Sequence, residues 1–292
     1  MLHRSSKHII QAMFKKILTS IILILLVVNV ITYNIVISYY TLDVTHYSLT
    51  SSKINDTIHI VMIADVHDFH CKIKNKTIAK IKELQPDIIL CVGDIIDDRS
   101  ANDHATLKYL QALRRIAPVY MSLGNHEMGY YAKRKSDLNR IRDQGITILD
   151  ETYEDIAIRN SKIRLGGLYN YAFSESSYKG KDRTMQFLKT FEKTSSYKIM
   201  MAHRPDSFIF GDGSQWSIEL VLSGHYHGGQ VILPFLGGLY APDQGFFPHY
   251  DYGMFQLKNM KMIITRGISS SDELLPRFNN PGEVVDITIK KR

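Results

Sequence analysis

Five short apolar segments that run directly into polar clusters constrain the fold of this chain most strongly. The clusters are Asp65-Val66-His67, Gly93-Asp94-Ile95-Ile96-Asp97, Gly124-Asn125-His126-Glu127, His203 and Gly224-His225-Tyr226-His227. In open α/β sheets the carboxyl ends of the strands line the ligand crevice, so we expect these clusters to converge. The sequence therefore predicts one active site built from the ends of several strands.

The chain after residue 57 alternates between strand-like and helix-like patterns. We predict strands at 58–64, 87–92, 118–123, 146–149, 153–158, 162–168, 198–202 and 219–223, and in the C-terminal stretches YGMFQL, MIITRGI and VVDITI; we predict helices near 76–85, 101–116, 132–144 and 181–193. The alternation in the first half indicates βαβ units, and the closely spaced strands at the end indicate antiparallel hairpins. A mixed α/β sandwich satisfies both halves.

A 21-residue stretch without a charge, 17–37, is long enough to cross a bilayer as a helix. Positive charges precede it and none follows until Lys53, which predicts a cytoplasmic N-terminus and an extracytoplasmic domain. We therefore expect a basic cytoplasmic segment at 1–16, a transmembrane signal-anchor at 17–37, a tether at 38–56 and the catalytic domain at 57–292. A cleaved signal peptide and a buried helix are the alternatives, and the bulky residues after the stretch disfavour cleavage.

The formal net charge of +7, once the N-terminal segment is set apart, argues against a nucleic-acid-binding protein. Four of the positive charges, at Arg4, Lys7, Lys15 and Lys16, precede the first acidic residue, Asp43. The rest of the chain shows no basic stripe of the kind that nucleic-acid binders carry. A mild positive surplus is compatible with an anionic substrate or an anionic membrane face.

The donor groups of the five clusters indicate a metal centre. Four histidines, two aspartates and one asparagine suit divalent manganese, iron or zinc, and the lack of cysteine ligands argues against a structural zinc site. This set exceeds the needs of one ion but suffices for two ions about 3.5–4 Å apart that share a carboxylate. Such a pair of ions can activate water and stabilise the charge of a phosphoryl transition state.

In this order the five clusters resemble the blocks DxH, GDxxD, GNH[ED], H and GHxH of the calcineurin-like metallophosphoesterase superfamily. The chain is similar to the membrane-associated bacterial branch of that superfamily at His203-Arg204-Pro205-Asp206, at 224–230 (GHYHGGQ), at Arg266-Gly267 and at Pro276-Arg277-Phe278-Asn279. The resemblance covers nearly all of the chain after residue 57. It implies a four-layer sandwich of two mixed β-sheets flanked by helices, preceded in the chain by an N-terminal transmembrane helix.

The resemblance also implies a role for each motif residue. Asp65, His67 and His227 would bind the first metal, Asp94 would bridge, and Asn125, His203 and His225 would bind the second metal. His126 would act as the proton donor to the leaving group, and Glu127 and Asp97 would support the ligands from behind. Arg266 and Arg277 are candidates for contacting a substrate phosphate, although arginines more often form salt bridges.

These features predict a hydrolase of phosphomonoester, phosphodiester or pyrophosphate bonds, with a lipid-linked substrate at the membrane. The resemblance brings in a UDP-linked diacylglucosamine as one such substrate, but the predicted extracytoplasmic topology counts against it. A phosphatase of soluble substrates, a nuclease and a catalytically weak metal-binding scaffold at the membrane are the alternatives. The full ligand set disfavours the scaffold, and the anchor and the missing basic groove disfavour the nuclease.

The segment 231–250 is apolar and aromatic with Gly and Pro breaks, which indicates an irregular lid after the last metal motif. Ordinary packing would account for its composition. The sharper hypothesis is an apolar groove for acyl chains, formed by Phe235, Leu236, Leu239, Phe246 and Phe247.

Overall fold

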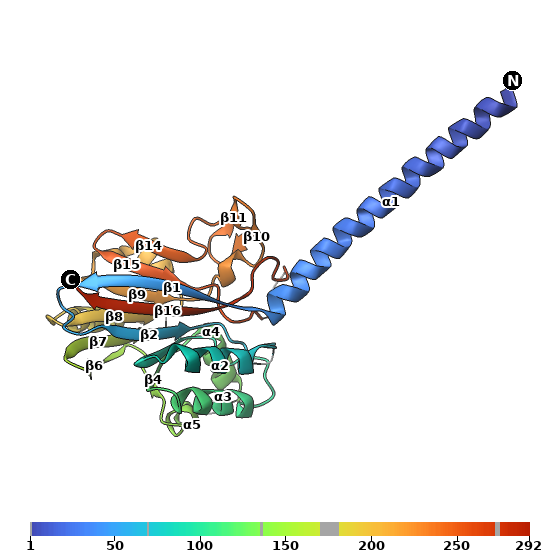
Figure 1. Cartoon of the computed structure of the whole chain (residues 1–292). Coiled ribbons are helices and arrows are strands. Elements are labelled where there is room, and N and C mark those ends of the chain that lie inside the picture. Colours follow the sequence, from blue (N-terminus) through green and yellow to red (C-terminus); the bar gives the residue numbers. More distant parts are fainter. Residues whose placement is uncertain (1, 69, 135–136, 170–180, 272–274) are drawn as a thin grey trace.

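Two six-stranded sheets packed face to face form the body of the domain, and a long helix leaves it at one edge (Figure 1). This computed structural model describes residues 2–68, 70–134, 137–169, 181–271 and 275–292. The long helix is α1 (Leu2–Tyr40).

The first sheet has the predicted parallel core. Its strands are, in spatial order, β1 (Leu42–Ser51), β16 (Gly282–Lys291), β2 (Ile58–Ile63), β3 (Ile88–Val92), β4 (Val119–Ser122) and β5 (Thr147–Ile148). Strands β2 to β5 run parallel, whereas β16 is antiparallel to β2 and parallel to β1. The sheet is therefore mixed, as expected.

The second sheet is also mixed. Its strands are, in spatial order, β14 (Gly253–Leu257), β15 (Met260–Ile264), β9 (Leu220–Ser223), β8 (Tyr197–Ala202), β7 (Ser161–Leu168) and β6 (Thr152–Ile158). The predicted hairpin pairs β14 with β15, while β16, the last predicted strand, crosses to the first sheet. Two small hairpins lie between β9 and β14: β10 (Ile232–Leu233) with β11 (Gly237–Gly238), and β12 (Tyr240–Ala241) with β13 (Gly245–Phe246).

Helices cover the outer face of each sheet and complete the predicted four layers. The first sheet is covered by α2 (Lys74–Leu84), α3 (His104–Arg114), α4 (Asn125–Arg134) and α5 (Asn139–Arg142). The second is covered by α6 (Lys181–Phe191) and α7 (Asp206–Ile209), and the 3-10 turns are η2 (Asp212–Gln215) and η3 (His227–Gly229). The single helix predicted near 132–144 is wrong in its bounds, because α4 already begins at Asn125.

The period-two alternation of each central strand separates two cores. In β2, Val61 and Ile63 pack in the core under the helices, whereas Ile60 and Met62 pack in the core between the sheets. All four side chains are fully buried. Strands buried on both faces must be apolar throughout, which explains why these segments read as continuous apolar runs.

The tether predicted at 38–56 is wrong, because its central part is strand β1. This strand pairs with β16 along its whole length, from Leu42 opposite Gly282 to Ser51 opposite Lys291. Leu49 is buried in the core, and the hydroxyl of Thr45 donates to the carboxylate of Glu283. The Ser- and Thr-rich sequence is that of an edge strand with one solvated face, and the domain therefore begins near residue 42 rather than at 57.

Helix α1 extends the predicted span at both ends. From Gln11 to Tyr40 it is long and apolar enough to cross a membrane, with a mean hydropathy of 2.5 and no burial within the protein over its most apolar window. It joins the domain at Tyr40, directly before β1.

The strand directions place the end of α1 at the same edge as the polar clusters. Strand β1 starts at this edge and runs parallel to β16, which is antiparallel to β2. The carboxyl end of β2, which leads to Asp65, therefore lies at the edge where α1 joins the domain (Figure 1).

Candidate metal centre

The chain bends sharply at the predicted ligands. Left-handed backbone conformations occur at Asp65 (φ 51°), His67 (φ 42°), Asp94 (φ 54°), His225 (φ 72°) and His227 (φ 48°). Such conformations are unfavourable for residues other than glycine and concentrate at functional sites. Backbone hydrogen bonds between neighbouring loops hold them, including His67 N–H to Asp94 O at 3.0 Å. The turns aim the side chains into one space beyond the strand ends.

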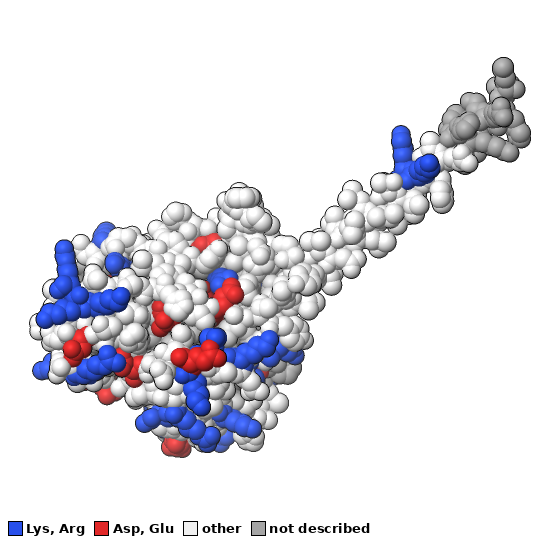
Figure 2. Space-filling model, in the orientation of Figure 1, with Lys and Arg blue, Asp and Glu red and all other residues white. Residues whose placement is uncertain are grey.

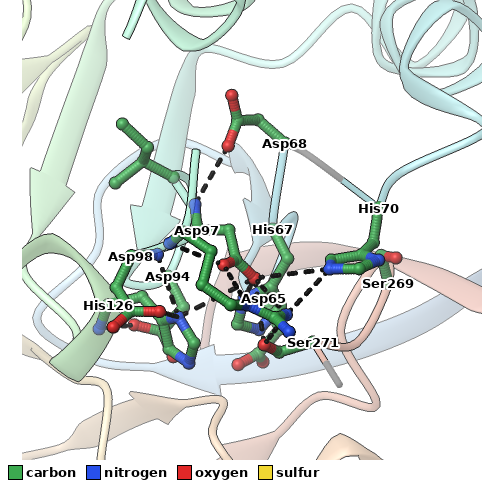
Figure 3. Close-up of polar contacts among 12 residues, drawn as sticks. Asp65, His67, Asp68, His70, Asp94, Asp97, Asp98, His126, Ser269 and Ser271 are labelled. Atoms are coloured by element: carbon green, nitrogen blue, oxygen red, sulfur yellow. Dashed lines mark hydrogen bonds and ion pairs between the residues drawn. The ribbon is translucent and has the colours of Figure 1, made fainter. Parts of the chain in front are cut away.

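The predicted ligands form two buried clusters. One contains Asp65, His67 and His227, and the other contains Asp94, His203 and His225, with the candidate ligand atoms of each cluster within 4.8 Å of one another. The two clusters adjoin, since Oδ1 of Asp65 lies 3.9 Å from Nε2 of both His203 and His227. Figure 3 shows Asp65 and His67, from the loop after β2, beside Asp94, from the loop after β3. The structure thus gathers six of the seven predicted ligands into the two groups that the family motif implied.

Hydrogen bonds orient the imidazoles of His203 and His227. Nδ1 of His203 lies 2.9 Å from the carbonyl oxygen of Val92, and Nδ1 of His227 lies 3.2 Å from that of Ser269. Since a carbonyl only accepts, both Nδ1 atoms carry the proton, and both Nε2 atoms face the carboxylates. A metal-binding histidine is usually fixed in this way.

Unpartnered polar atoms test whether the site suits a cation. Among the residues that the structure describes, none gives a hydrogen bond to Nε2 of His67 or to Oδ1 of Asn125, although both atoms are buried. An unpartnered buried acceptor is costly, and metal coordination removes that cost. Asn125, the seventh predicted ligand, also starts α4 beside Asp94, whose Oδ1 accepts the N–H of His126 at 2.8 Å. The residues present therefore fit divalent ions.

The buried carboxylates of Asp65 and Asp94 also favour a cation beside them. Burial raises the pKa of Asp65, and the carboxylate of Asp94 raises it further, although His203 opposes this. Burial alone would lower the pKa of His203, but the carboxylates of Asp94 and Asp65 raise it to about 9. Positive charge is thus favoured where the two carboxylates meet.

Two glycines of the motifs leave room for the carboxylates. A Cβ at Gly124 would lie 2.1 Å from Oδ1 of Asp94, and a Cβ at Gly224 would lie 2.4 Å from Oδ2 of Asp65. Both contacts are far inside van der Waals distance. Only glycine therefore fits at these two positions.

His126, the predicted proton donor, lies at the rim of the site. Its side chain is 18% exposed, and its ring contacts that of His67 with centroids 4.5 Å apart. Nδ1 of His126 accepts the backbone N–H of Asp98 at 3.2 Å (Figure 3). Since Nδ1 accepts, the neutral ring carries its proton on Nε2, and the Nε2–H group is able to donate a hydrogen bond.

Glu127 supports the site through the backbone. Its fully buried carboxylate accepts four backbone N–H groups, those of Asp94, Ile95, Ile96 and Gly124, at 2.7 to 3.1 Å. These bonds join the loop after β3 to the loop after β4. Glu127 thus fixes the backbone of Asp94.

Asp97 lies beside His67, on the side of Nδ1. Its carboxylate is 3.5 Å from Nδ1 of His67 and accepts hydrogen bonds from Arg99 and from the hydroxyl of Ser271. His70, on the loop after β2, contacts Arg99 at 2.8 Å. Figure 3 shows this network beside the metal ligands.

The two arginines predicted to contact substrate form their hydrogen bonds and ion pairs within the protein. Arg277 is fully buried, and its guanidinium donates to carbonyl oxygens that include Ser269 O at 2.6 Å and Arg266 O at 2.9 Å. Arg266 lies 3.4 Å from Glu283 and 3.2 Å from Asp43. Because Arg277 is enclosed by the protein, a substrate cannot reach its guanidinium. The hydrogen bonds to carbonyl oxygens show that Arg277 holds the backbone of the loop that carries Ser269.

Three supporting residues were not predicted. Asp243 lies 3.2 Å from Nε2 of His225, Asp68 accepts the N–H of Asp97, and Asp98 donates to His126 through its backbone. Asp98 directly follows a motif and was detectable there. Asp243 comes from the segment between β12 and β13, far from any ligand motif in sequence, so only the fold reveals it.

Comparison with known proteins decides the family. Residues 58–229, more than half of the chain, match the family model of the calcineurin-like phosphoesterases. The chain belongs to the calcineurin-like phosphoesterase family. It is accordingly a metal-binding hydrolase of phosphoester bonds, as the sequence predicted.

Individual relatives agree with this assignment. The uncharacterized metallophosphoesterase YkuE of Bacillus subtilis is 29% identical over 86% of this chain and 86% of its own length. The phosphodiesterase YaeI of Escherichia coli is 27% identical over 72% of this chain and 75% of its own length. A Danio rerio protein described as a transmembrane protein with a metallophosphoesterase domain is 23% identical over 80% of this chain and 53% of its own length.

Proposed function

We propose that this chain is a membrane-anchored phosphoesterase that uses two divalent metal ions, manganese, iron or zinc, to hydrolyse a phosphate or pyrophosphate ester of a lipid-linked substrate. The observation that carries the proposal is the pair of adjoining ligand clusters at the edge of the domain where α1 joins it. The family membership supports the chemistry, and the position of the site supports the substrate class.

The two clusters divide the ligands as two ions require. Asp65, His67 and His227 would hold one ion, and Asn125, His203 and His225 would hold the other, with Asp94 between them. When bound, the ions would polarise the phosphoryl oxygens and activate water for in-line attack.

The chain's own residues would position the substrate and stabilise the leaving group. His126 lies at the rim with its proton on Nε2, where it can donate a hydrogen bond to the oxygen of the leaving group as negative charge builds up there. Asp98 holds the ring in this tautomer through its backbone N–H. Glu127 keeps the two loops that carry Asp94 and Asn125 in register, so the phosphate would meet a fixed geometry.

A cleft joins the site region to the membrane helix. This cleft of about 320 Å³ is lined by Ile35, Val36, Tyr39 and Tyr40 of α1 and by His70, Lys72, Ser270 and Ser271. Its α1 side is apolar and aromatic, whereas its other side contains His70 and Ser271, which contact the Arg99–Asp97 pair beside His67. A substrate with an apolar tail and an anionic head matches both sides.

The orientation of the anchor completes the proposal. The basic residues before the apolar stretch favour a cytoplasmic N-terminus, which places the domain and its site at the outer surface of the cell membrane. A substrate embedded in the outer leaflet would meet the site directly at the end of α1.

Competition between substrates tests the lipid-linked part of this proposal. The full chain in detergent micelles, loaded with manganese, would be assayed with bis-p-nitrophenyl phosphate while a lipid pyrophosphate or a phospholipid is added. We expect the lipid to be hydrolysed and to inhibit release of p-nitrophenol competitively. A soluble alcohol phosphate with the same head group but no acyl chain is the matched control. Equal competition by both compounds would show that the lipid chain is not recognised.

A further inference from the structure

The segment between η3 and β14 exposes an unusual number of large apolar side chains. We call residues 231–247 the aromatic loop. Four of its side chains are largely exposed: Phe235 (107%), Leu236 (66%), Phe246 (66%) and Phe247 (59%). Outside α1, the other large apolar side chains with high exposure in the described part of the chain are Met128, Phe210 and Met254. Clustered exposed apolar residues usually mark an interaction surface.

The backbone of the aromatic loop holds these side chains outward. The β10–β11 hairpin pairs Leu233 with Gly237 and presents Phe235 and Leu236 at its tip. The β12–β13 hairpin presents Phe246. Leu239 lies between the hairpins and joins them, because its N–H donates to the carbonyl of Val231 and its carbonyl accepts the N–H of Phe247, both at 2.8 Å. Four of the five residues predicted to form an acyl-binding groove are thus largely exposed to solvent, and the fifth, Leu239, is half-buried.

A short chain segment ties the aromatic loop to the end of α1. The N–H of Ile232 donates to the carbonyl of Phe278 at 3.0 Å, and the side-chain amide of Asn279 donates to the carbonyl of Ile232 at 3.2 Å. On its other side this segment reaches α1: the N–H of Arg277 donates to the hydroxyl of Tyr39 at 3.2 Å, and the N–H of Asn280 donates to the hydroxyl of Ser38 at 3.0 Å. The position of the aromatic loop is thus fixed relative to the candidate membrane span.

The distribution of charged side chains also favours a membrane contact at the aromatic loop. Figure 1 shows β10 and β11 on the side of the domain toward which α1 extends. Figure 2 shows Lys and Arg side chains over the left and lower parts of this face and beside the foot of α1, while the protrusion at the top of the domain and most of the described part of α1 are uncharged. An uncharged aromatic surface beside a membrane span is suited to the interfacial region of a bilayer, where aromatic side chains are favoured.

We propose that the aromatic loop inserts Phe235, Leu236, Phe246 and Phe247 into the surface of the bilayer that α1 spans, and so docks the metal centre against the lipid headgroups. This inference rests on the membrane anchoring in the proposed function and adds a second contact to it. The hydrogen bonds from Arg277 and Asn280 hold the domain against the end of α1. A second contact, with the bilayer itself, would keep the site edge facing the membrane.

Fluorescence quenching by brominated lipids tests the docking directly. The chain has one tryptophan, Trp216, so a Trp216→Phe background with Phe235→Trp places a single probe at the tip of the loop. The matched control carries Ala157→Trp, since Ala157 is exposed on β6 and pairs with Lys162 beside the β6–β7 turn, at the edge away from the site. Both full-length proteins would be reconstituted in phosphatidylcholine–phosphatidylglycerol vesicles with and without brominated acyl chains.

We expect brominated lipid to quench the Phe235→Trp probe strongly and to leave the Ala157→Trp probe unchanged. Equal fluorescence of the Phe235→Trp protein in both kinds of vesicle would overturn the proposal. A blue shift of this probe that depends on protein concentration in detergent, without quenching by lipid, would assign the surface to a second copy of the chain and would equally overturn it.

A charged variant separates this inference from the proposed function. The double substitution Phe235→Asp and Leu236→Asp should reduce hydrolysis of a vesicle-embedded phosphodiester and leave hydrolysis of soluble bis-p-nitrophenyl phosphate unchanged. An equal loss on both substrates would contradict docking as the role of the loop. If the unmodified chain hydrolyses neither substrate, the proposed function fails, whereas the quenching result still decides the docking.

Discussion

The backbone N–H of Asp98 donates to Nδ1 of His126 over 3.2 Å, which leaves Nε2 of His126 as the protonated atom of the neutral ring. We predict that His126→Asn lowers kcat by roughly 10²–10³-fold on an alkyl phosphate, because the negative charge on the alkoxide leaving group loses the hydrogen bond from Nε2–H. The loss should be much smaller on p-nitrophenyl phosphate, whose leaving group carries its negative charge without such a hydrogen bond. Steady-state kinetics on both esters measure the difference.

The matched control for His126 is Asp98→Ala, which keeps the backbone donor and removes only the carboxylate. It should retain most activity on both esters. Metal content should be unchanged in both variants, since His126 is not among the predicted ligands. Equal losses on the two esters by His126→Asn would show that His126 does not act on the leaving group.

Glu127 tests whether a residue that is not itself a predicted ligand affects metal binding through the backbone of the ligand loops. We predict that Glu127→Gln weakens metal binding by about 10–100-fold, because an amide cannot accept all four backbone N–H groups and the turn at Asp94 would shift. Isothermal titration with Mn²⁺ measures the change. Met128→Ala, at an exposed neighbouring position, should bind Mn²⁺ normally. Unchanged affinity in Glu127→Gln would show that these bonds do not matter for the ligands.

Arg277 should act on stability and not on substrate affinity. Its carbonyl partner Ser269 O also contacts Nδ1 of His227, so the guanidinium holds the loop behind this ligand. Hydrogen bonds to charged groups contribute about 1.5–3 kcal/mol each, so we predict that Arg277→Met lowers the free energy of unfolding by at least about 2 kcal/mol. Thermal unfolding checks this. A raised KM with an unchanged Tm would instead support the substrate contact that the sequence suggested.

The edge strand β1 should be required for folding of the domain. We predict that a chain beginning at residue 57 aggregates or unfolds at a much lower temperature, because it lacks the strand that covers β16 and the buried Leu49. A chain beginning at residue 42 keeps this strand and serves as the control. Calorimetric unfolding compares the two. Equal Tm values would show that β1 is dispensable, as the predicted tether implied.

The candidate ligands could be brought together from the sequence because the information that places them is local. Each ligand follows an apolar strand directly, so the strand pattern and the motif together place Asp65 or His225 at a strand end without knowledge of the pairing. The four layers follow from the same pattern, since strands buried on both faces require cover on each side.

The sequence failed where a residue's role depends on a distant partner. The polar alternation of 42–51 fits a tether and an edge strand equally, and only the pairing with β16 decides. Arg277 reads as a surface cation until the carbonyls around it are known, and Asp243 reaches His225 only because the aromatic loop folds back over the site.

Hydrolysis of bis-p-nitrophenyl phosphate and p-nitrophenyl phosphate by the full chain, with metal content measured on the same samples, tests the central claim most directly. Asp94 lies among the ligands, with Oδ2 3.0 Å from Nε2 of His203, so Asp94→Ala should lose both bound metal and turnover. We predict that the unmodified chain binds two Mn²⁺ ions, hydrolyses at least one ester, and loses that activity on chelation or in Asp94→Ala. Turnover that survives both chelation and Asp94→Ala would contradict a metal-dependent phosphoesterase at this site.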